Sequence, residues 1–258
     1  MVMEYRRVLA VGDIHGEYQK LLTLYDKIKF NPVEDLLVFL GDYIDRGPES
    51  LKCLLFVWKL KLKYPERVVV LLGNHETMLM EYFSHARDAR WGMPIGGMWD
   101  CAADDTWKKY NGGASTAREI RRAMRQNPSF LGKLLRFLQG SAVSLFCLTS
   151  HEMGFIFAHG GIVPGCPIDE QPADEVQWIR EECYKEYTGQ VVYSRGDVPA
   201  PATLVIGHTP VTTLDPEYLP VPIWLTNGVI FCDTGSYFDF GRLSCVDVVS
   251  EHRNYWQA

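Results

Sequence analysis

Apolar and polar positions alternate in blocks along the N-terminal part of the chain. Short runs rich in valine and leucine predict buried strands, and longer stretches with apolar side chains three and four residues apart predict helices. The strands are predicted at residues 7–12, 35–42 and 67–76, and the helices at 17–29 and 50–64. Pro65 follows the second helix directly and marks its end. This β-α-β-α-β order predicts a layered α/β fold.

The strand signals stop between residues 77 and 140. This segment contains several tryptophans, an Asn-Gly-Gly sequence at 111–113 and four arginines within 117–126. It predicts helices and loops. We interpret its basic stretch as a solvated helix face, with contact to an acidic partner as the alternative.

Strand signals return in the C-terminal half. Four apolar runs are predicted to form a second sheet packed on the first, at residues 154–161, 202–210, 229–235 and 243–249. We find no repeat and no linker-like segment. We therefore expect one domain over residues 1–258, with 77–140 as a mainly helical subregion.

Composition narrows the class of protein. Of 258 residues, 47% are hydrophobic and 22% are charged, as in ordinary globular domains. The net charge of -6 does not favour nucleic acid or an anionic membrane as a partner. The first apolar run is only about five residues long, and no run approaches the ~20 residues of a membrane span. The seven cysteines form no CxxC pair and are expected to be reduced, so we predict a cytoplasmic protein.

Polar clusters follow the predicted strands one after another. Each is a glycine-flanked turn that carries aspartate, histidine or asparagine. The clusters are GDIHG at 12–16, GDYIDRG at 41–47, GNHE at 73–76, HGG at 159–161 and GHTP at 207–210. Any one of them alone is typical of a solvated turn, a helix cap or a core histidine. Because ligands of α/β sheets gather beyond the carboxyl ends of strands, all five together predict one site.

The clusters supply a set of candidate metal ligands. These are Asp13, His15, Asp42, Asn74, His159 and His208. The set is rich in oxygen and lacks thiolate, unlike a structural zinc site. One carboxylate could bridge two ions, and ions ~3.5–4 Å apart are typical of in-line displacement at phosphorus. The ions would acidify a bridging water, and the resulting hydroxide would attack.

Together these motifs resemble the metallophosphoesterase superfamily. They are most similar to the phosphoprotein phosphatases, the serine/threonine phosphatases with compact bacterial and phage members. The resemblance implies a calcineurin-like metallophosphoesterase fold, with two packed mixed β-sheets flanked by helices. It also implies a phosphomonoesterase that acts on phosphoserine and phosphothreonine in proteins by direct hydrolysis. Phosphorylated proteins would be its partners, without nucleic acid or membrane, and its oligomeric state stays open.

The resemblance implies a role for each metal ligand. Asp13 and His15 would bind one ion and Asp42 would bridge both. Asn74, His159 and His208 would complete the second ion site. We expect two divalent ions, with Mn²⁺ preferred over the alternatives Fe and Zn.

The resemblance also implies residues that act on the substrate. Arg46 and Asn74 would hold phosphate oxygens, and Arg180 in QWIR (177–180) would be a second phosphate-binding arginine. A solvated arginine at a helix end is the alternative for Arg180. Cations and arginines suit the charge on the phosphate oxygens. His75 would be the general acid for the basic leaving alkoxide, and the Asp45 carboxylate would orient it.

One family feature is not matched in the sequence. Larger eukaryotic members carry an aromatic residue near the site, within a C-terminal segment. Here that region reads CDTGSYFDFG, and Tyr237 is only a loose candidate for this aromatic residue. For Tyr237 we expect an ordinary core or surface position.

Symmetrical bis(5'-nucleosyl)-tetraphosphatases are the main alternative. They share the fold and most metal motifs, but typically lack aspartate at the position of Asp45 and tend to read GNHD in the third motif. Asp45 and Glu76 therefore favour a protein phosphatase. A non-catalytic module is disfavoured because the ligand set, His75, Asp45 and Arg46 are all present. A nuclease is disfavoured by the net charge.

Overall fold

The first sheet follows the predicted N-terminal strands. A computed structural model describes residues 5–91, 102–189, 201–215, 217 and 219–258. Its first sheet has the order β10-β9-β1-β2-β3, and β1, β2 and β3 run parallel. Its strands are β1 Arg7–Val11, β2 Asp35–Phe39, β3 Val68–Val70, β9 Ser244–Asp247 and β10 Tyr255–Gln257.

The second sheet has the order β4-β5-β6-β8-β7, and β5, β6 and β8 run parallel. Its strands are β4 Leu145–Ser150, β5 Met153–Ala158, β6 Ala202–Ile206, β7 Ile223–Trp224 and β8 Val229–Phe231. Two mixed sheets are therefore confirmed. The assignment of 243–249 to the second sheet is wrong, because β9 pairs antiparallel with β1. Both faces of β9 are buried, so its apolar run does not indicate which sheet it joins.

Alternate residues of the strands face two different cores. In β1, Val8 and Ala10 pack between the sheets against residues such as Phe157, whereas Leu9 and Val11 face the helices. This alternation follows from the two-residue period of a strand. Because a parallel sheet in a layered fold is covered on both faces, its strands read as continuous apolar runs.

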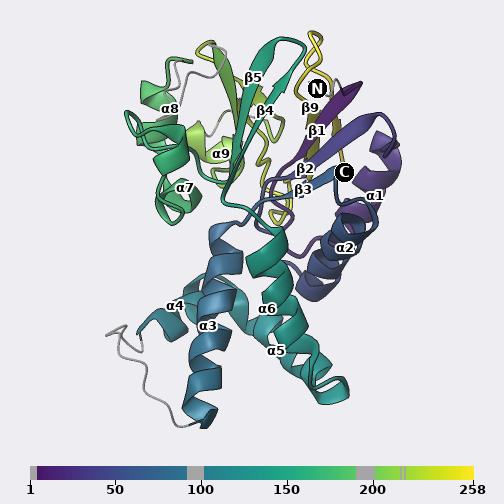
Figure 1. Cartoon of the computed structure of the whole chain (residues 1–258), viewed down its shortest axis with the longest axis vertical. Helices are drawn as coiled ribbons and strands as arrows, with labels where there is room; N and C mark the ends of the chain where they lie inside the picture. Colours follow the sequence, from purple (N-terminus) through teal and green to yellow (C-terminus); the bar gives the residue numbers. More distant parts are fainter. Residues whose placement is uncertain (1–4, 92–101, 190–200, 216, 218) are drawn as a thin grey trace.

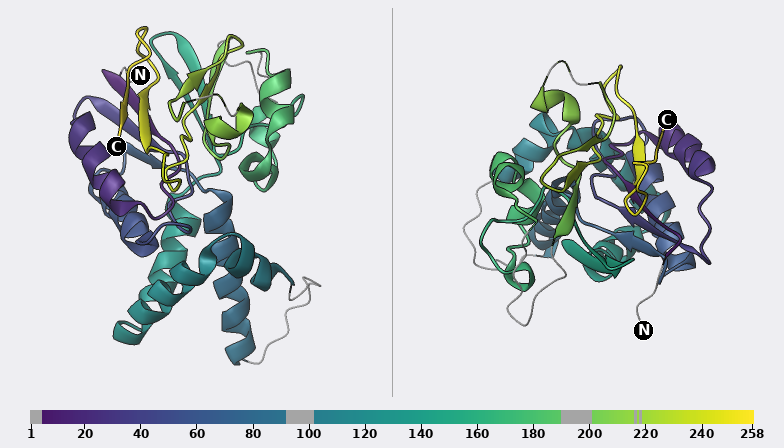
Figure 2. Two further views of the ribbon diagram at one scale, coloured as in Figure 1. Left: turned by 180° about the vertical axis from the view of Figure 1, so that it is seen from behind. Right: turned by 90° about the horizontal axis from the view of Figure 1, so that it is seen from above.

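Helices cover the outer faces of the sheets. Figures 1 and 2 show α1 (Tyr18–Ile28) and α2 (Ser50–Lys63) beside the first sheet. Shorter helices lie beside the second sheet: α7 Glu175–Trp178, α8 Glu181–Glu186 and α9 Val211–Leu214. Within the described residues, no helix is long and apolar enough to cross a membrane.

A group of four helices extends from one end of the two sheets (Figure 1). They are α3 Asn74–Trp91, α4 Ala102–Tyr110, α5 Gly113–Gln126 and α6 Phe130–Ser141. Helices and loops were predicted for residues 77–140. The strand predicted at 67–76 is too long, because β3 is Val68–Val70 and α3 already begins at Asn74. Trp99 and Cys101 lie outside the described residues.

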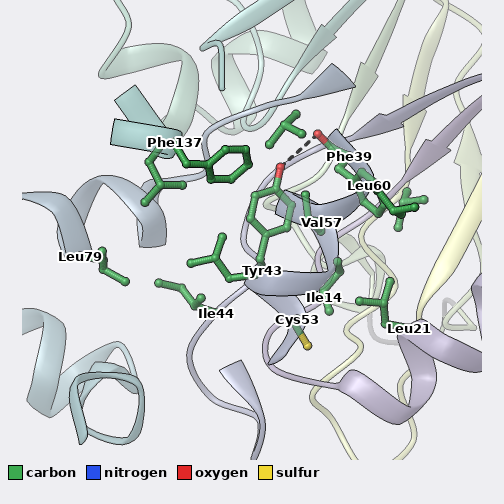
Figure 3. Close-up of a cluster of buried hydrophobic side chains, with 14 of the residues drawn as sticks. Ile14, Leu21, Phe39, Tyr43, Ile44, Cys53, Val57, Leu60, Leu79 and Phe137 are labelled. Atoms are coloured by element: carbon green, nitrogen blue, oxygen red, sulfur yellow. Dashed lines mark hydrogen bonds between the residues drawn. The ribbon is translucent and has the colours of Figure 1, made fainter. Parts of the chain in front are cut away.

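Tyr43 anchors the loop after β2 to the core. Its ring packs edge-on against Phe39, and its hydroxyl donates to the Leu71 carbonyl at 2.5 Å. Figure 3 shows this ring among buried side chains that include Val57 and Phe137. With Tyr43 fixed inward, the neighbouring polar residues of the loop are free to face the site.

Candidate metal centre

Asp42 lies at the centre of the polar cluster. Its Oδ2 is 3.5 Å from His15 Nε2, and its Oδ1 is 3.3 Å from His159 Nε2. Two groups of potential metal ligands share this carboxylate, namely His15–Asp42–His75 and Asp42–His159–His208. Because the two oxygens face different groups, Asp42 has the geometry of a bridging ligand.

His15 presents an unprotonated nitrogen to the first group. Its Nδ1 is 2.9 Å from the Ile44 carbonyl, which can only accept, so Nδ1 carries the proton. Its Nε2 faces Asp13 Oδ2 at 3.9 Å. Burial lowers the pKa of His15 well below its usual value and keeps the ring neutral. A neutral ring held by a backbone carbonyl is the usual state of a metal-binding histidine.

The second group contains His159 and Asn74. His159 Nδ1 bonds the Leu40 carbonyl at 2.8 Å, and its Nε2 is 3.0 Å from Asn74 Oδ1. Burial opposes the charged ring, but the Asp42 carboxylate outweighs burial and raises the pKa of His159. Nε2 therefore faces oxygen acceptors on two sides, an environment that suits a positive charge.

His208 completes this group from the loop after β6. Its backbone N–H donates to Asp13 Oδ1 at 3.0 Å, which ties the two sheets together at the site. Its Nε2 is buried and has no hydrogen-bond partner among the described residues. Burial and the neighbouring His159 lower the pKa of His208 to about 2, so this nitrogen keeps its lone pair.

Negative charge is crowded at the site. Burial and the charges of Asp233 and Asp42 raise the pKa of Asp13 well above its usual value. Burial also raises the pKa of Asp233 to about 6, and Asp233 Oδ2 is a second buried atom without a partner among the described residues. Crowded carboxylates together with imidazole nitrogens, of which His208 Nε2 has no partner in the described part of the chain, are the donor set of divalent cations with mixed ligands. These residues therefore fit a metal centre.

The backbone at the site is held in an unusual conformation. Five residues that are not glycine have positive φ angles, which cost on the order of 1–2 kcal/mol each. They are His15 (45°), Asp42 (50°), Asp45 (71°), Arg46 (64°) and His208 (60°). Backbone bonds hold this geometry, since the N–H groups of Ile14 and His15 both donate to the Asp42 carbonyl. Such strain is typical of functional sites.

His75 and Asp45 form a buried pair beside the ligands. His75 Nδ1 donates to Asp45 Oδ2 over 2.7 Å. Its Nε2 lies 3.7 Å from Asp42 Oδ2, so this nitrogen points toward the metal ligands. His75 is 1% exposed and Asp45 is fully buried. The structure thus brings together the two residues that the sequence predicted as partners.

The two candidate phosphate-binding arginines lie at different sides of the cluster. Arg46 Nη1 is 2.7 Å from His15 Nε2. Arg180 donates through Nη1 to the His208 carbonyl at 3.2 Å and to Thr209 Oγ1 at 3.0 Å. Arg180 therefore lies beside the second group of ligands, although it is exposed and stands at the start of α8. Its role in phosphate binding stays a prediction.

Tyr237 lies at the site, and the expectation of an ordinary core or surface position is wrong. Its ring centroid is 4.5 Å from Arg46 Cζ and 5.1 Å from the His15 ring, which it meets edge-on. The loop between β8 and β9 brings it there. The sequence offered no spacing signal for this contact.

Other site residues were not predicted. Glu76 accepts from the backbone N–H groups of Asp42, Tyr43 and Gly73, so it shapes the loop after β2. Asp233 follows β8 as Asp42 follows β2, and its place after an apolar run was the signal that could have found it. Trp107 and Thr116 contact Asp45.

The remaining histidines lie away from the cluster where the structure describes them. His252 is exposed in a turn, and His151 lies in a turn where its Nε2 is 2.8 Å from the Tyr5 carbonyl. The His85 side chain lies outside the described residues.

The fold and the site together define a class. Two packed mixed sheets carry, at the ends of their parallel strands, a buried cluster of carboxylates and imidazoles that are candidate metal ligands. The chain belongs to the calcineurin-like phosphoesterase family, whose family model matches residues 6–248. The superfamily inferred from the motifs is thereby confirmed.

Curated relatives are similar over part of their length. Serine/threonine-protein phosphatase PP1-delta of Caenorhabditis elegans is 45% identical over 69 residues, which is 27% of this chain and 22% of that protein. Serine/threonine-protein phosphatase 2 of Escherichia coli is 42% identical over 98 residues, which is 37% of this chain and 40% of that protein. The aligned part is thus less than half of either relative.

Two solved structures show the same fold. A candidate diadenosine tetraphosphatase superposes with a TM-score of 0.60 at 20% identity, covering 100% of this chain and 96% of that one. A serine/threonine phosphatase of Saccharomyces cerevisiae, described as similar to human PP5, gives a TM-score of 0.54 at 17% identity, covering 96% and 76%. At these identities the comparisons establish the fold alone.

Proposed function

We propose that this protein is a metal-dependent phosphomonoesterase that hydrolyses phosphoserine and phosphothreonine in proteins. The observation that carries this proposal is the buried His75–Asp45 pair, whose imidazole faces the shared carboxylate Asp42. A serine or threonine alkoxide is a strongly basic leaving group, and it needs a proton donor at this place. The names of the curated relatives support the same substrate class.

We propose two divalent ions at this site. Asp13 and His15 would hold one, Asn74, His159 and His208 the other, and Asp42 both. When bound, such ions supply positive charge for the phosphate oxygens and acidify a water molecule that becomes the nucleophile. We propose Mn²⁺ as the native ion, with Fe and Zn as alternatives, because mixed oxygen and nitrogen ligands suit all three.

The other site residues would bind the phosphate and move a proton. Arg46 and Arg180, from two sides, would hold the phosphate oxygens, and Asn74 would face them. As the bond between phosphorus and the new water oxygen forms, the bond to the serine or threonine oxygen breaks. The leaving oxygen then takes the proton of His75 Nε2, while Asp45 holds Nδ1–H in place. Once the alcohol and the phosphate have left, His75 Nε2 would regain its proton from solvent.

The alternative is hydrolysis of dinucleoside tetraphosphates. Its leaving group is a nucleoside diphosphate, whose phosphate oxygen is far less basic than an alkoxide and has little need of a proton from a held imidazole. The pair of His75 with Asp45 therefore favours the alkyl phosphate. We further propose that residues 1–258 act as one catalytic domain. A cytoplasmic location stays a prediction.

A comparison of rates tests the proposal. The Mn²⁺-loaded protein is offered a phosphoserine peptide, a phosphotyrosine peptide and diadenosine tetraphosphate at equal concentrations. We expect kcat/KM to be highest for the phosphoserine peptide. A higher value for diadenosine tetraphosphate would replace the proposed substrate class.

A further inference from the structure

We infer that Trp107 and Thr116, from helices α4 and α5, are positioning residues that hold Asp45 and through it His75. The inference rests on the proposed function, because it assigns these residues to the proton transfer proposed for His75. Both lie far from the metal motifs in the sequence, in the helices that extend beyond the sheets (Figure 1).

The Asp45 carboxylate accepts three side-chain hydrogen bonds. His75 Nδ1 and Trp107 Nε1 share Oδ2, at 2.7 and 2.5 Å, and Thr116 Oγ1 donates to Oδ1 at 2.5 Å. All four residues are at most 1% exposed. Each carboxylate oxygen thus has a donor from α4 or α5. These two bonds fix the plane of the carboxylate without the bond from His75.

The backbone of Asp45 is held independently of these bonds. Its φ angle is 71°, and its N–H donates to Ser50 Oγ at 2.8 Å. The carboxylate still has rotational freedom about its own side-chain bonds. Trp107 and Thr116 remove this freedom at the two oxygens, and apart from His75 no other side-chain donor to these oxygens is found among the described residues.

Two glycines allow the helices to come this close. A Cβ on Gly113 would lie 2.2 Å from the Trp107 ring, and a Cβ on Gly112 would lie 2.7 Å from the Arg46 backbone nitrogen. Gly112 also has a φ of 81°, which favours glycine. The two glycines of the Asn-Gly-Gly sequence therefore let the Trp107 ring pack against Gly113 and let the start of α5 lie against the backbone of Arg46.

A further contact joins α5 to the same loop. Glu119 Oε2, one turn after Thr116, accepts from the Leu51 N–H at the start of α2 at 3.0 Å. Ser50, which supports the Asp45 backbone, is the first residue of that helix. The loop, α2 and α5 are therefore bonded to one another, and the position of Asp45 depends on the packing of the helices.

This arrangement has a chemical consequence. An imidazole gives its proton efficiently only when its nitrogen is aimed at the leaving oxygen, and small misplacements are costly. Loss of either helix donor would leave Asp45 with fewer bonds and His75 with a wider range of orientations. The effect would be specific for substrates whose leaving group needs the proton.

Four variants test the inference. Trp107→Phe keeps the aromatic packing and removes the N–H, and Thr116→Val removes the hydroxyl at nearly constant volume. Thr116→Ser keeps the hydroxyl, and the double variant Trp107→Phe/Thr116→Val removes both donors. Matched controls are Trp58→Phe, whose ring stacks on Phe137, and Ser115→Ala, whose hydroxyl bonds only Gly112 within the described contacts. Within the described part of the chain, neither control side chain bonds to Asp45.

The readout is the ratio of kcat on a phosphoserine peptide to kcat on p-nitrophenyl phosphate. We expect the ratio to fall about tenfold in the double variant and by smaller factors in the single ones, since general acid catalysis contributes about 10²–10⁴ in total. Thr116→Ser and both controls should keep the wild-type ratio. If the double variant loses activity equally on both substrates, the residues are merely structural and the inference is wrong.

A measurement without metal or substrate gives independent evidence. In the metal-free protein labelled with ¹⁵N-tryptophan, the signal lost in Trp107→Phe identifies the Trp107 indole. We expect its N–H proton to lie downfield of the other indoles and to shift upfield in Asp45→Asn. If the Trp107 N–H signal does not shift in Asp45→Asn, the inference is wrong even when the protein is active. If the signal shifts but the wild-type protein does not hydrolyse phosphopeptides, only the proposed function is wrong.

Discussion

The Glu76 carboxylate accepts a hydrogen bond from the backbone N–H of Asp42 over 2.8 Å. Further bonds from Tyr43 and Gly73 reach the same side chain, so Glu76 fixes the backbone on which the shared carboxylate stands. Glu76 is fully buried. In the sequence, Glu76 served as a marker of substrate class. In the structure Glu76 supports the loop through backbone N–H groups, whereas the Asp45 side chain bonds to the His75 ring.

The first prediction tests whether Glu76, like Asp45, affects the choice of substrate or only supports the loop. Glu76→Asp shortens the side chain by one methylene group, so it cannot reach all three N–H groups. We expect a loss of about 1–3 kcal/mol in the free energy of unfolding, because buried donors lose their acceptor. The preference for a phosphoserine peptide over diadenosine tetraphosphate should be unchanged. Urea denaturation and the two rates check this, and a reversed preference would show that Glu76 determines the substrate.

Metal content tests the role of Asp42. Asp42→Asn replaces one oxygen of the carboxylate that lies between both ligand groups. We expect the purified variant to lose at least one of two Mn²⁺ ions per chain after dialysis, as measured by elemental analysis. Asp26→Asn is the matched control, because Asp26 pairs with Lys29 at the surface. Full occupancy in Asp42→Asn would contradict the bridging geometry.

The strands and the ligand set were predictable because both follow from local patterns. Apolar runs marked β1, β2, β5, β6 and β8, and each is followed directly by a polar site residue. By contrast, β4, β7 and β10 were missed. In β4 most residues are only half-buried, and β7 and β10 have two and three residues, so none of the three gives a clear period.

The surroundings of the ligands were not predictable for a different reason. Trp107 and Thr116 reach Asp45 from 62 and 71 residues away, and Tyr237 reaches Arg46 from a loop near the C-terminus. These contacts depend on how helices and loops pack on the sheets. Sequence periodicity reports which face of an element is buried, but it does not report which partner covers it.

The pH dependence of stability is predicted from Asp35 at the start of β2. Burial alone would raise its pKa, but hydrogen bonds from Arg7 and from the Asn31 N–H outweigh burial, and the pKa is lowered from its usual 3.8. A lowered pKa means that the folded state binds fewer protons than the unfolded state. The stabilisation by Asp35 is therefore complete above about pH 5 and is lost as the pH falls below about 4.

Asp35→Asn should show this directly. At pH 7 we expect a loss of about 1–3 kcal/mol in the free energy of unfolding, since Arg7 loses its charged acceptor. The difference from wild type should shrink steadily between pH 5 and pH 3. Glu34→Gln, which removes a surface partner of Arg6, should change little at any pH. A difference that stays constant down to pH 3 would contradict the assigned pKa direction.

The most direct test of the central claim is the leaving-group dependence of His75→Asn. The claim is that His75, held by Asp45, protonates the alkoxide of a phosphoserine or phosphothreonine. We expect kcat on a phosphoserine peptide to fall about 10²–10⁴-fold, and kcat on p-nitrophenyl phosphate, whose leaving group needs little protonation, to fall much less. An equal fall on both substrates, with the metal content of the wild type retained, would contradict the claim.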